Sequence, residues 1–176
     1  MNANNIVLTG FMGTGKTTTG IALAKKLNRT FIDTDICIEE RFKMSIPEIF
    51  RVHGEKSFRN LEEEIIREVS GQQFAVISTG GGIVLNKENI NHLRKKGKIY
   101  LLHGDLRTII TNLKASRSNR PLLNNSDWEK TVEELLKFRK DLYHNSADFI
   151  ISIGKKTILN IADEIIELHR NIEYLE

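Results

Sequence analysis

Short apolar runs alternate with longer amphipathic segments along the chain. The apolar runs, which have the length expected of buried strands, lie at residues 6–9, 31–32, 74–77, 99–102 and 149–151. After each run, apolar residues recur at every third or fourth position, as they do on one face of a helix. Five alternations of strand and helix predict an α/β protein in which helices cover both faces of a parallel sheet.

Local signals indicate where several helices begin and end. Ser45 and Glu48 have the spacing of a capping box, and Ser126 and Glu129 repeat it later in the chain. Gly97 is expected to end the helix that precedes it.

Composition narrows the class of protein but leaves the partner open. The chain has 176 residues, 28% of them charged, and is expected to form one domain over residues 1–176. The 26 Lys and Arg exceed the 23 Asp and Glu by only three, and the two signs are interleaved. A single cysteine excludes an intrachain disulfide. Because no secretory signal and no apolar run of about 20 residues is visible, we expect a cytoplasmic protein without a membrane partner.

Residues 10–17, GFMGTGKT, match the phosphate-binding pattern G-x-x-x-x-G-K-[ST] between a strand and a helix. In this loop the backbone N–H groups turn inward around phosphates, and the helix N-terminus adds its positive end. Lys16 is expected to reach the β- and γ-phosphates, and the Thr17 hydroxyl to ligate Mg²⁺. The sequence thus predicts a site for a nucleoside triphosphate with Mg²⁺, formed by Gly13, Thr14, Gly15, Lys16, Thr17 and Thr18.

The phosphate-binding motif alone does not specify how the triphosphate is used. The N-K-x-D and D-x-x-G elements of a GTPase are absent from the sequence, and a mechanical ATPase usually carries more chain. Transfer of a phosphoryl group to a small acceptor is the remaining common use. A nucleotide-dependent switch or a nucleic-acid binder, which the pI near 9.0 would suit, is the alternative from another class.

Candidate acceptor residues follow the second and third strands. Asp33 and Asp35 are two residues apart and can project to the same side of an extended strand end. One could then position Mg²⁺ while the other accepts a proton from an attacking hydroxyl. Capping of the following helix is the rival interpretation for either aspartate. Three consecutive glycines at 80–82 indicate a backbone that must pass very close to another group, although a plain loop is possible.

Two arginines interrupt or border apolar helix faces. Arg139 falls within a stripe that includes Leu135 and Leu142, so its guanidinium must meet an anion or reach outward to solvent. Arg59 has Glu62 and Glu63 at helical spacing, and spacing alone favours a surface salt bridge.

Taken together, these residues resemble the shikimate kinase family of P-loop proteins, over nearly the whole chain. The motifs that carry the resemblance are residues 10–17, 31–35 with 38–39, 45–50, 54–55, 58–59, 78–82, 120–123, and Arg139 with Tyr143. The family's fold is a three-layer α/β/α P-loop kinase with a five-stranded parallel sheet in 2-3-1-4-5 order. The resemblance further implies substrate-binding helices at about 36–70 and a mobile lid at about 114–127.

The resemblance implies transfer of the γ-phosphoryl group of ATP to the 3-hydroxyl of shikimate. Asp35 would orient or deprotonate the attacking hydroxyl, and Asp33 would act with Thr17 at Mg²⁺. Arg59 and Arg139 would hold the shikimate carboxylate.

Other roles follow from the same resemblance. Gly80, Gly81 and Gly82 would give backbone contacts to shikimate, Ser78 would act at the metal through water, and Arg120 in the lid would close over the phosphates. Either Lys114 or Arg117 would stack on adenine. We expect a monomer with ATP and shikimate as partners and no nucleic acid. A kinase of another small acceptor, such as gluconate or a nucleoside monophosphate, is the nearest alternative.

Overall fold

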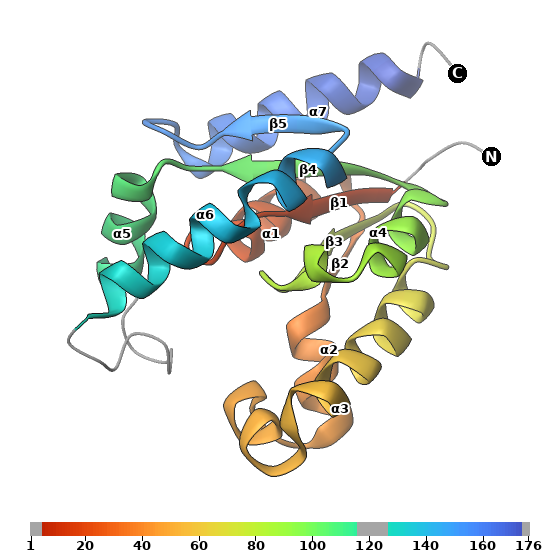
Figure 1. The fold of residues 1–176 in the computed structure, drawn as a ribbon. Coiled ribbons are helices and arrows are strands. Elements are labelled where there is room, and N and C mark those ends of the chain that lie inside the picture. The colour runs from red at the N-terminus through yellow and green to blue at the C-terminus, as the bar shows by residue number, and fades with distance from the viewer. Residues whose placement is uncertain (1–4, 116–126, 174–176) are drawn as a thin grey trace.

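Five parallel strands form the centre of the molecule. The computed structural model describes residues 5–115 and 127–173. The strands are β1 (Asn5–Thr9), β2 (Thr30–Asp33), β3 (Ala75–Ser78), β4 (Gly97–His103) and β5 (Phe149–Ser152). They pair in the order β2-β3-β1-β4-β5, which confirms the predicted fold class (Figure 1).

Helices flank the sheet on both faces. They are α1 (Lys16–Leu27), α2 (Thr34–Phe42), α3 (Ile46–Val69), α4 (Lys87–Arg94), α5 (Leu106–Ala115), α6 (Trp128–Ser146) and α7 (Ile158–Glu173), with the short 3-10 turn η1 (Ile83–Leu85). In Figure 1, α1 and α7 lie behind the sheet, and α4 and α6 lie in front of it.

The alternation of side chains along β1 builds two cores. Ile6 and Leu8 point to the side of α1 and α7, where they pack with Leu23 and Ile165. Val7 points to the opposite side, where the core is formed with α3, α4, α5 and α6. Because both faces are covered, every residue of β1 is buried, as is typical of central parallel strands.

Two expectations about helix ends need correction or remain open. The helix before Gly97 ends at Arg94, and Gly97 instead begins β4. A Cβ at Gly97 would lie 2.8 Å from Val7 Cγ2, so close packing of the strands explains the glycine. The capping box of Ser45 and Glu48 is present, with the Glu48 carboxylate accepting from the Ser45 N–H at 2.9 Å. The second box includes residue 126, which lies outside the described residues.

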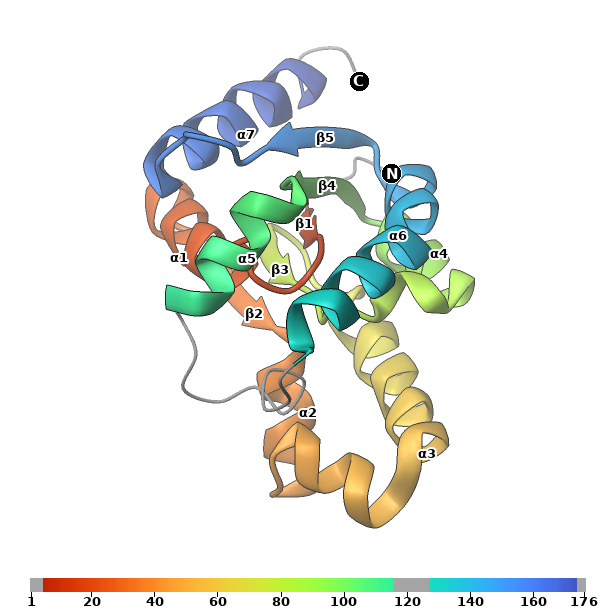
Figure 2. The ribbon, with the colours of Figure 1, turned by 60° about the vertical axis from the view of Figure 1, so that its left-hand side comes forward.

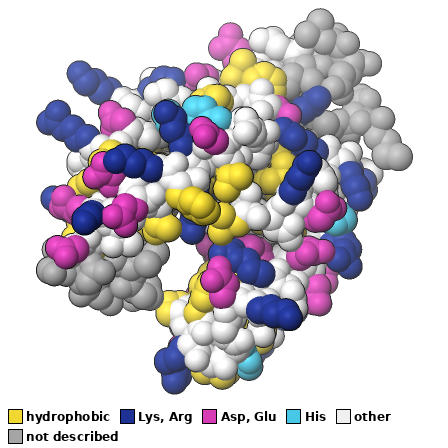
Figure 3. Space-filling view, viewed as in Figure 1, with side chains coloured by type: hydrophobic (Ala, Val, Ile, Leu, Met, Phe, Trp, Pro, Cys, Tyr) yellow, Lys and Arg dark blue, Asp and Glu magenta, His cyan; other side chains and the backbone are white. Residues whose placement is uncertain are grey.

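A lobe built from α2 and the first half of α3 projects away from the sheet (Figures 1 and 2). Helix α3 is kinked at Gly54, whose backbone has φ 75° and ψ 169°. The space-filling view shows the molecule hollowed between this lobe and the sheet, with charged side chains around the hollow (Figure 3). Among the helices of the described residues, none has the length and hydropathy needed to cross a bilayer.

Candidate active site

The loop between β1 and α1 has the conformation that the phosphate-binding motif predicts. Gly13 and Gly15 each have φ 81°, a left-handed conformation that glycine adopts without steric cost. The Lys16 ammonium donates to the backbone carbonyls of Gly10 at 2.8 Å and Phe11 at 3.0 Å. The lysine therefore folds back over the loop whose N–H groups would surround the phosphates.

The threonine hydroxyls of this loop have different partners. Thr14 donates to the Phe11 carbonyl at 2.8 Å, and Thr18 donates to the Gly15 carbonyl at 2.9 Å, so both brace the loop. The Thr17 hydroxyl instead donates to Asp33 Oδ2 at 2.9 Å, across 16 residues of sequence. Thr17 is thus the threonine that faces the acidic residues.

Asp33 caps a helix with one carboxylate oxygen and contacts the phosphate-binding loop with the other. Asp33 ends β2 and caps α2, because its Oδ1 accepts from the Asp35 N–H at 3.1 Å. Its Oδ2 faces Thr17. Asp35 lies in the first turn of α2 rather than on an extended strand end, which corrects the sequence-based placement.

The Thr17–Asp33 pair suits Mg²⁺ in donor type, since hydroxyl and carboxylate oxygens are the hard ligands that this ion prefers. The described residues contain no cluster of three or more His, Cys, Asp or Glu side chains that could hold a metal alone. Magnesium commonly binds through one or two protein ligands together with phosphate oxygens and waters. The residues present therefore fit a metal that arrives with a nucleotide.

The carboxyl group of Asp35 has a strongly shifted pKa. Burial raises its pKa to about 6 from an ordinary 3.8, and the negative charge of Asp33 adds to the rise. The nearby Lys16 ammonium lowers this pKa and so limits the shift. A carboxylate that takes up protons near pH 6 can act as a general base at neutral pH.

The triple glycine lies against the acidic and basic side chains of the site. A Cβ at Gly80 would stand 2.5 Å from Asp35 Oδ1, and one at Gly82 would stand 2.6 Å from Arg59 Nη1. The Gly80 N–H donates to the buried Thr34 hydroxyl at 3.2 Å. Close approach of side chains, rather than an unusual backbone conformation, explains why glycine occurs at residues 80 and 82.

Arg139 and Tyr143 of α6 converge on the middle glycine. Arg139 Nη1 donates to the Gly81 carbonyl at 3.0 Å, and the Tyr143 hydroxyl donates to the same oxygen. Burial raises the pKa of Tyr143 to about 12, so the hydroxyl keeps its proton. The buried Arg139 Nε has no hydrogen-bond partner among the described residues. Arg139 therefore points to the glycine loop.

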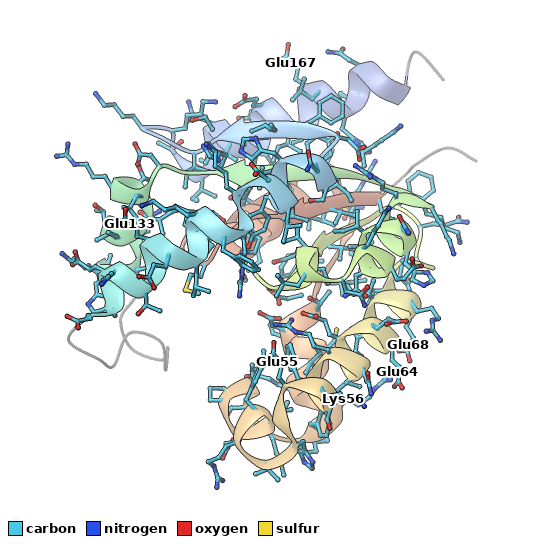
Figure 4. The ribbon with its side chains drawn as sticks, viewed as in Figure 1. Glu55, Lys56, Glu64, Glu68, Glu133 and Glu167 are labelled. Atoms are coloured by element: carbon cyan, nitrogen blue, oxygen red, sulfur yellow. The ribbon has the colours of Figure 1, made fainter. Side chains whose placement is uncertain are left out.

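Arg59 forms a half-buried ion pair rather than the surface salt bridge that spacing favoured. Its Nη1 lies 2.9 Å from Oε2 of Glu62, which is only 2% exposed. A second contact, at 3.3 Å, joins it to the exposed Glu55 at the kink of α3 (Figure 4). Glu63, the other expected partner, pairs instead with Arg67.

The structure therefore brings Lys16, Thr17, Asp33 and Asp35 together at the carboxyl ends of β1 and β2, with the two arginines aimed at the same glycine loop. Sequence reasoning missed the contacts of Thr34 and Tyr143. Tyr143 is an aromatic residue at an apolar position of its helix, and no local pattern indicates a partner for its hydroxyl.

The remaining residues expected to act at the site are Ser78, Lys114, Arg117 and Arg120. Arg117 and Arg120 lie outside the described residues. Lys114 pairs with Glu129 of α6 at 2.7 Å. Ser78 is buried at the end of β3.

A phosphate-binding loop, an acidic pair at the adjacent strand end and an arginine-lined glycine loop define a P-loop phosphotransferase. The sequence model of the family described as shikimate kinase matches residues 12–170. Shikimate kinases of Caldicellulosiruptor saccharolyticus and Caldanaerobacter subterraneus are 46% and 47% identical to the chain, over 94% of this chain and 95% of each relative. The chain belongs to the shikimate kinase family, whose members are ATP-dependent kinases.

Solved structures agree with this assignment. The shikimate kinase of Acinetobacter baumannii in complex with shikimate has a TM-score of 0.88 and 34% identity, covering 94% of this chain and 92% of that one. The enzyme of Aquifex aeolicus has a TM-score of 0.81 and 32% identity, covering 97% and 98%. A gluconokinase of Sinorhizobium meliloti, 15% identical with a TM-score of 0.60, covers 99% and 98% and shares the fold alone.

Proposed function

We propose that the chain transfers the γ-phosphoryl group of ATP to the 3-hydroxyl of shikimate, giving shikimate 3-phosphate and ADP. The observation that carries this proposal is the position of Asp35. Its half-buried carboxylate, with a pKa of about 6, lies near Lys16 of the phosphate-binding loop and against Gly80 of the glycine loop. A base in this position can reach a hydroxyl held between the two loops.

Asp35 receives the proton of the attacking hydroxyl. At neutral pH it is largely ionised, so it can accept a hydrogen bond from that hydroxyl before transfer. Lys16 stabilises negative charge that develops on the phosphates. Phosphoryl transfer depends mainly on positioning and electrostatics. Asp35 contributes to the first by orienting the hydroxyl, and Lys16 contributes to the second by stabilising the charge on the phosphates.

Arg59 and Arg139 bind the carboxylate of the acceptor. A guanidinium can hold a carboxylate through two parallel hydrogen bonds. Arg139 has a buried Nε without a partner among the described residues, and Arg59 is oriented by Glu62. The glycine loop contacts both arginines, since Arg59 lies against Gly82 and Arg139 donates to the Gly81 carbonyl.

Thr17 and Asp33 would hold Mg²⁺ together with the nucleotide. The ion, when bound, neutralises charge on the phosphate oxygens. Arg120 of the lid would add a positive charge over the phosphates, and closure of the lid would exclude water as a competing acceptor.

We further propose that the enzyme is monomeric and cytoplasmic.

A coupled assay of ADP release with purified protein tests the proposal. Shikimate should support turnover in the presence of ATP and Mg²⁺, whereas gluconate and nucleoside monophosphates should not. Lys16→Ala and Asp35→Asn should abolish turnover without unfolding the protein. Turnover with gluconate or a nucleotide, but none with shikimate, would disprove the proposed acceptor.

A further inference from the structure

Thr34 lies between the two aspartates of the candidate site, and its hydroxyl contacts the glycine loop. The side chain is only 1% exposed, and its Oγ1 accepts from the Gly80 N–H at 3.2 Å, across 46 residues of sequence. β2 and β3 pair with Asp33 opposite Ser78, so the residues that follow the two strands leave the sheet side by side. Thr34 therefore joins the end of β2 to the start of the glycine loop.

The Gly80 N–H depends on this hydroxyl. Gly80 is buried, and its N–H donates to the Thr34 hydroxyl. A buried backbone N–H without an acceptor is rare in folded proteins. Loss of the Thr34 hydroxyl should therefore make the chain at Gly80 shift until the N–H meets water or another acceptor.

A shift of Gly80 would change the surroundings of Asp35. A Cβ at Gly80 would lie 2.5 Å from Asp35 Oδ1, so the Gly80 backbone lies directly against that carboxylate group. The Gly80 carbonyl also accepts from the Ile83 N–H at 3.2 Å, which ties Gly80 to the turn η1. The position of Gly80 thus limits the directions in which the Asp35 carboxylate can turn.

The glycine loop has a second attachment, to α6. There Arg139 and Tyr143 both donate to the Gly81 carbonyl. This attachment includes a side chain proposed to bind the acceptor carboxylate, whereas the attachment through Thr34 bears on the proposed base. Loss of the first should weaken acceptor binding, and loss of the second should slow the transfer step.

We propose that Thr34 is a positioning residue for phosphoryl transfer. Its hydroxyl holds Gly80 against Asp35, and the carboxylate then keeps the orientation in which it accepts the proton of the attacking hydroxyl. The transfer rate depends steeply on the geometry of the reacting groups, so a small displacement of this kind is costly. The inference rests on the proposed function, which gives Asp35 its role as a base.

Two substitutions at Thr34 separate the hydroxyl from the rest of the side chain. Thr34→Val removes the hydroxyl and keeps the branched shape, whereas Thr34→Ser keeps the hydroxyl. In single-turnover experiments with saturating ATP, Mg²⁺ and shikimate, Thr34→Val should form shikimate 3-phosphate about tenfold more slowly, with both KM values changed by less than about twofold. Thr34→Ser should react within about threefold of the rate of the unchanged protein. Should Thr34→Val not fold, Thr34→Ala gives the same comparison.

Thr79→Val is the matched control. Thr79 is 2% exposed, and its hydroxyl donates to the Leu8 carbonyl at 3.0 Å. The Thr79 N–H donates to the same carbonyl at 3.1 Å, so the backbone stays attached when the hydroxyl is lost. This variant loses a buried hydrogen bond of the same kind and leaves the Gly80 N–H with its partner. Its transfer rate should stay within about twofold of that of the unchanged protein, whereas a merely structural role of Thr34 predicts the same rate for both valine variants.

Exchange of the Gly80 amide hydrogen, followed by NMR in the ligand-free protein, reports the contact without turnover. It should be faster in Thr34→Val than in Thr34→Ser or the unchanged protein. The inference is overturned if this exchange is the same in all three, or if Thr34→Val transfers as fast as the unchanged protein. It is equally overturned if Thr34→Ser or Thr79→Val is as slow as Thr34→Val. Failure of the unchanged protein to phosphorylate shikimate would instead overturn the proposed function, and the role of Thr34 with it.

Discussion

Arg59 Nη1 lies 2.9 Å from Oε2 of Glu62, a carboxylate that is only 2% exposed, whereas the arginine side chain is 24% exposed. Burial raises the pKa of Glu62, and the positive charges of Arg59 and Arg139 oppose the rise. The carboxylate therefore depends on the arginines to stay ionised. In return it holds the Arg59 guanidinium at Gly82, where a substrate carboxylate would bind.

Glu62→Gln should raise the KM for shikimate about tenfold while changing kcat and the KM for ATP little. The amide keeps the size of the side chain but loses the charge that orients Arg59, and the free energy of unfolding should fall by about 1–3 kcal/mol. Steady-state kinetics and urea unfolding check both effects. Glu63→Gln is the matched control, because Glu63 pairs with Arg67 at the surface and should leave the KM unchanged. Equal effects of the two variants would contradict the role assigned to Glu62.

Alanine substitutions in the glycine loop should separate turnover from binding. Gly80→Ala would push its Cβ to 2.5 Å from Asp35 Oδ1, so we expect kcat to fall at least about tenfold. Gly82→Ala would displace the Arg59 guanidinium, so we expect the KM for shikimate to rise by a similar factor. Comparison of kcat and KM for the two variants tests the assignment. If both changed the same kinetic constant in the same way, the two glycines would not serve separate side chains.

Tyr143→Phe should weaken shikimate binding without loss of the fold. The ring remains in the core, but the Gly81 carbonyl keeps only the bond from Arg139, so the loop and the arginine are less firmly held. Loss of one hydrogen bond of this kind costs about 1 kcal/mol, which corresponds to a rise in KM of about fivefold. Steady-state kinetics at varied shikimate concentration measure this rise in KM. A KM equal to that of the unchanged enzyme would show that Tyr143 does not contribute to shikimate binding.

The sheet and its order follow from features that a sequence displays locally or through a family resemblance. Strands buried on both faces appear as short apolar runs, and the glycine-rich loop after the first of them is a local motif. The prediction that Gly97 ends a helix is wrong, because the need for glycine at this position does not arise from neighbouring residues in the sequence. Gly97 lies where β4 passes close to Val7, and such packing between distant segments leaves no periodic signal.

The candidate site was predictable to the extent that its residues break local patterns. Arg139 stands out because it interrupts an apolar stripe, although Leu142 of that stripe is 38% exposed and lies outside the buried face. Tyr143 does not stand out, because an aromatic residue at a core position is ordinary and its hydroxyl partner is 62 residues away. The contact between Asp33 and Thr17 likewise joins residues 16 positions apart, and their spacing alone does not reveal it.

Turnover should fall as the pH drops below about 6. Asp35 must be ionised to accept a proton, and burial together with the charge of Asp33 raises its pKa to about 6. Phosphate groups also titrate near pH 6, so a control is needed. Glu39→Gln removes a carboxylate that raises the pKa of Asp35. The glutamine amide oxygen can still accept from the Ile46 N–H, as the carboxylate does. The acid limb of kcat should move to lower pH in this variant. An unmoved limb would assign the titration to the nucleotide.

Asp35→Asn should stabilise the protein at neutral pH while it abolishes turnover. The folded-state pKa of about 6 lies above the ordinary 3.8, so between these values the folded state holds more protons than the unfolded state. The free energy of unfolding of the unchanged protein therefore falls as the pH rises from about 4 to 6, because the carboxylate must ionise in a half-buried position. The amide carries no charge and avoids this loss, so the variant should be more stable at pH 7 by on the order of 2 kcal/mol, with the difference vanishing near pH 4. Urea unfolding at both pH values measures the difference. A destabilised Asp35→Asn at pH 7 would show that the carboxylate is held by contacts stronger than its desolvation.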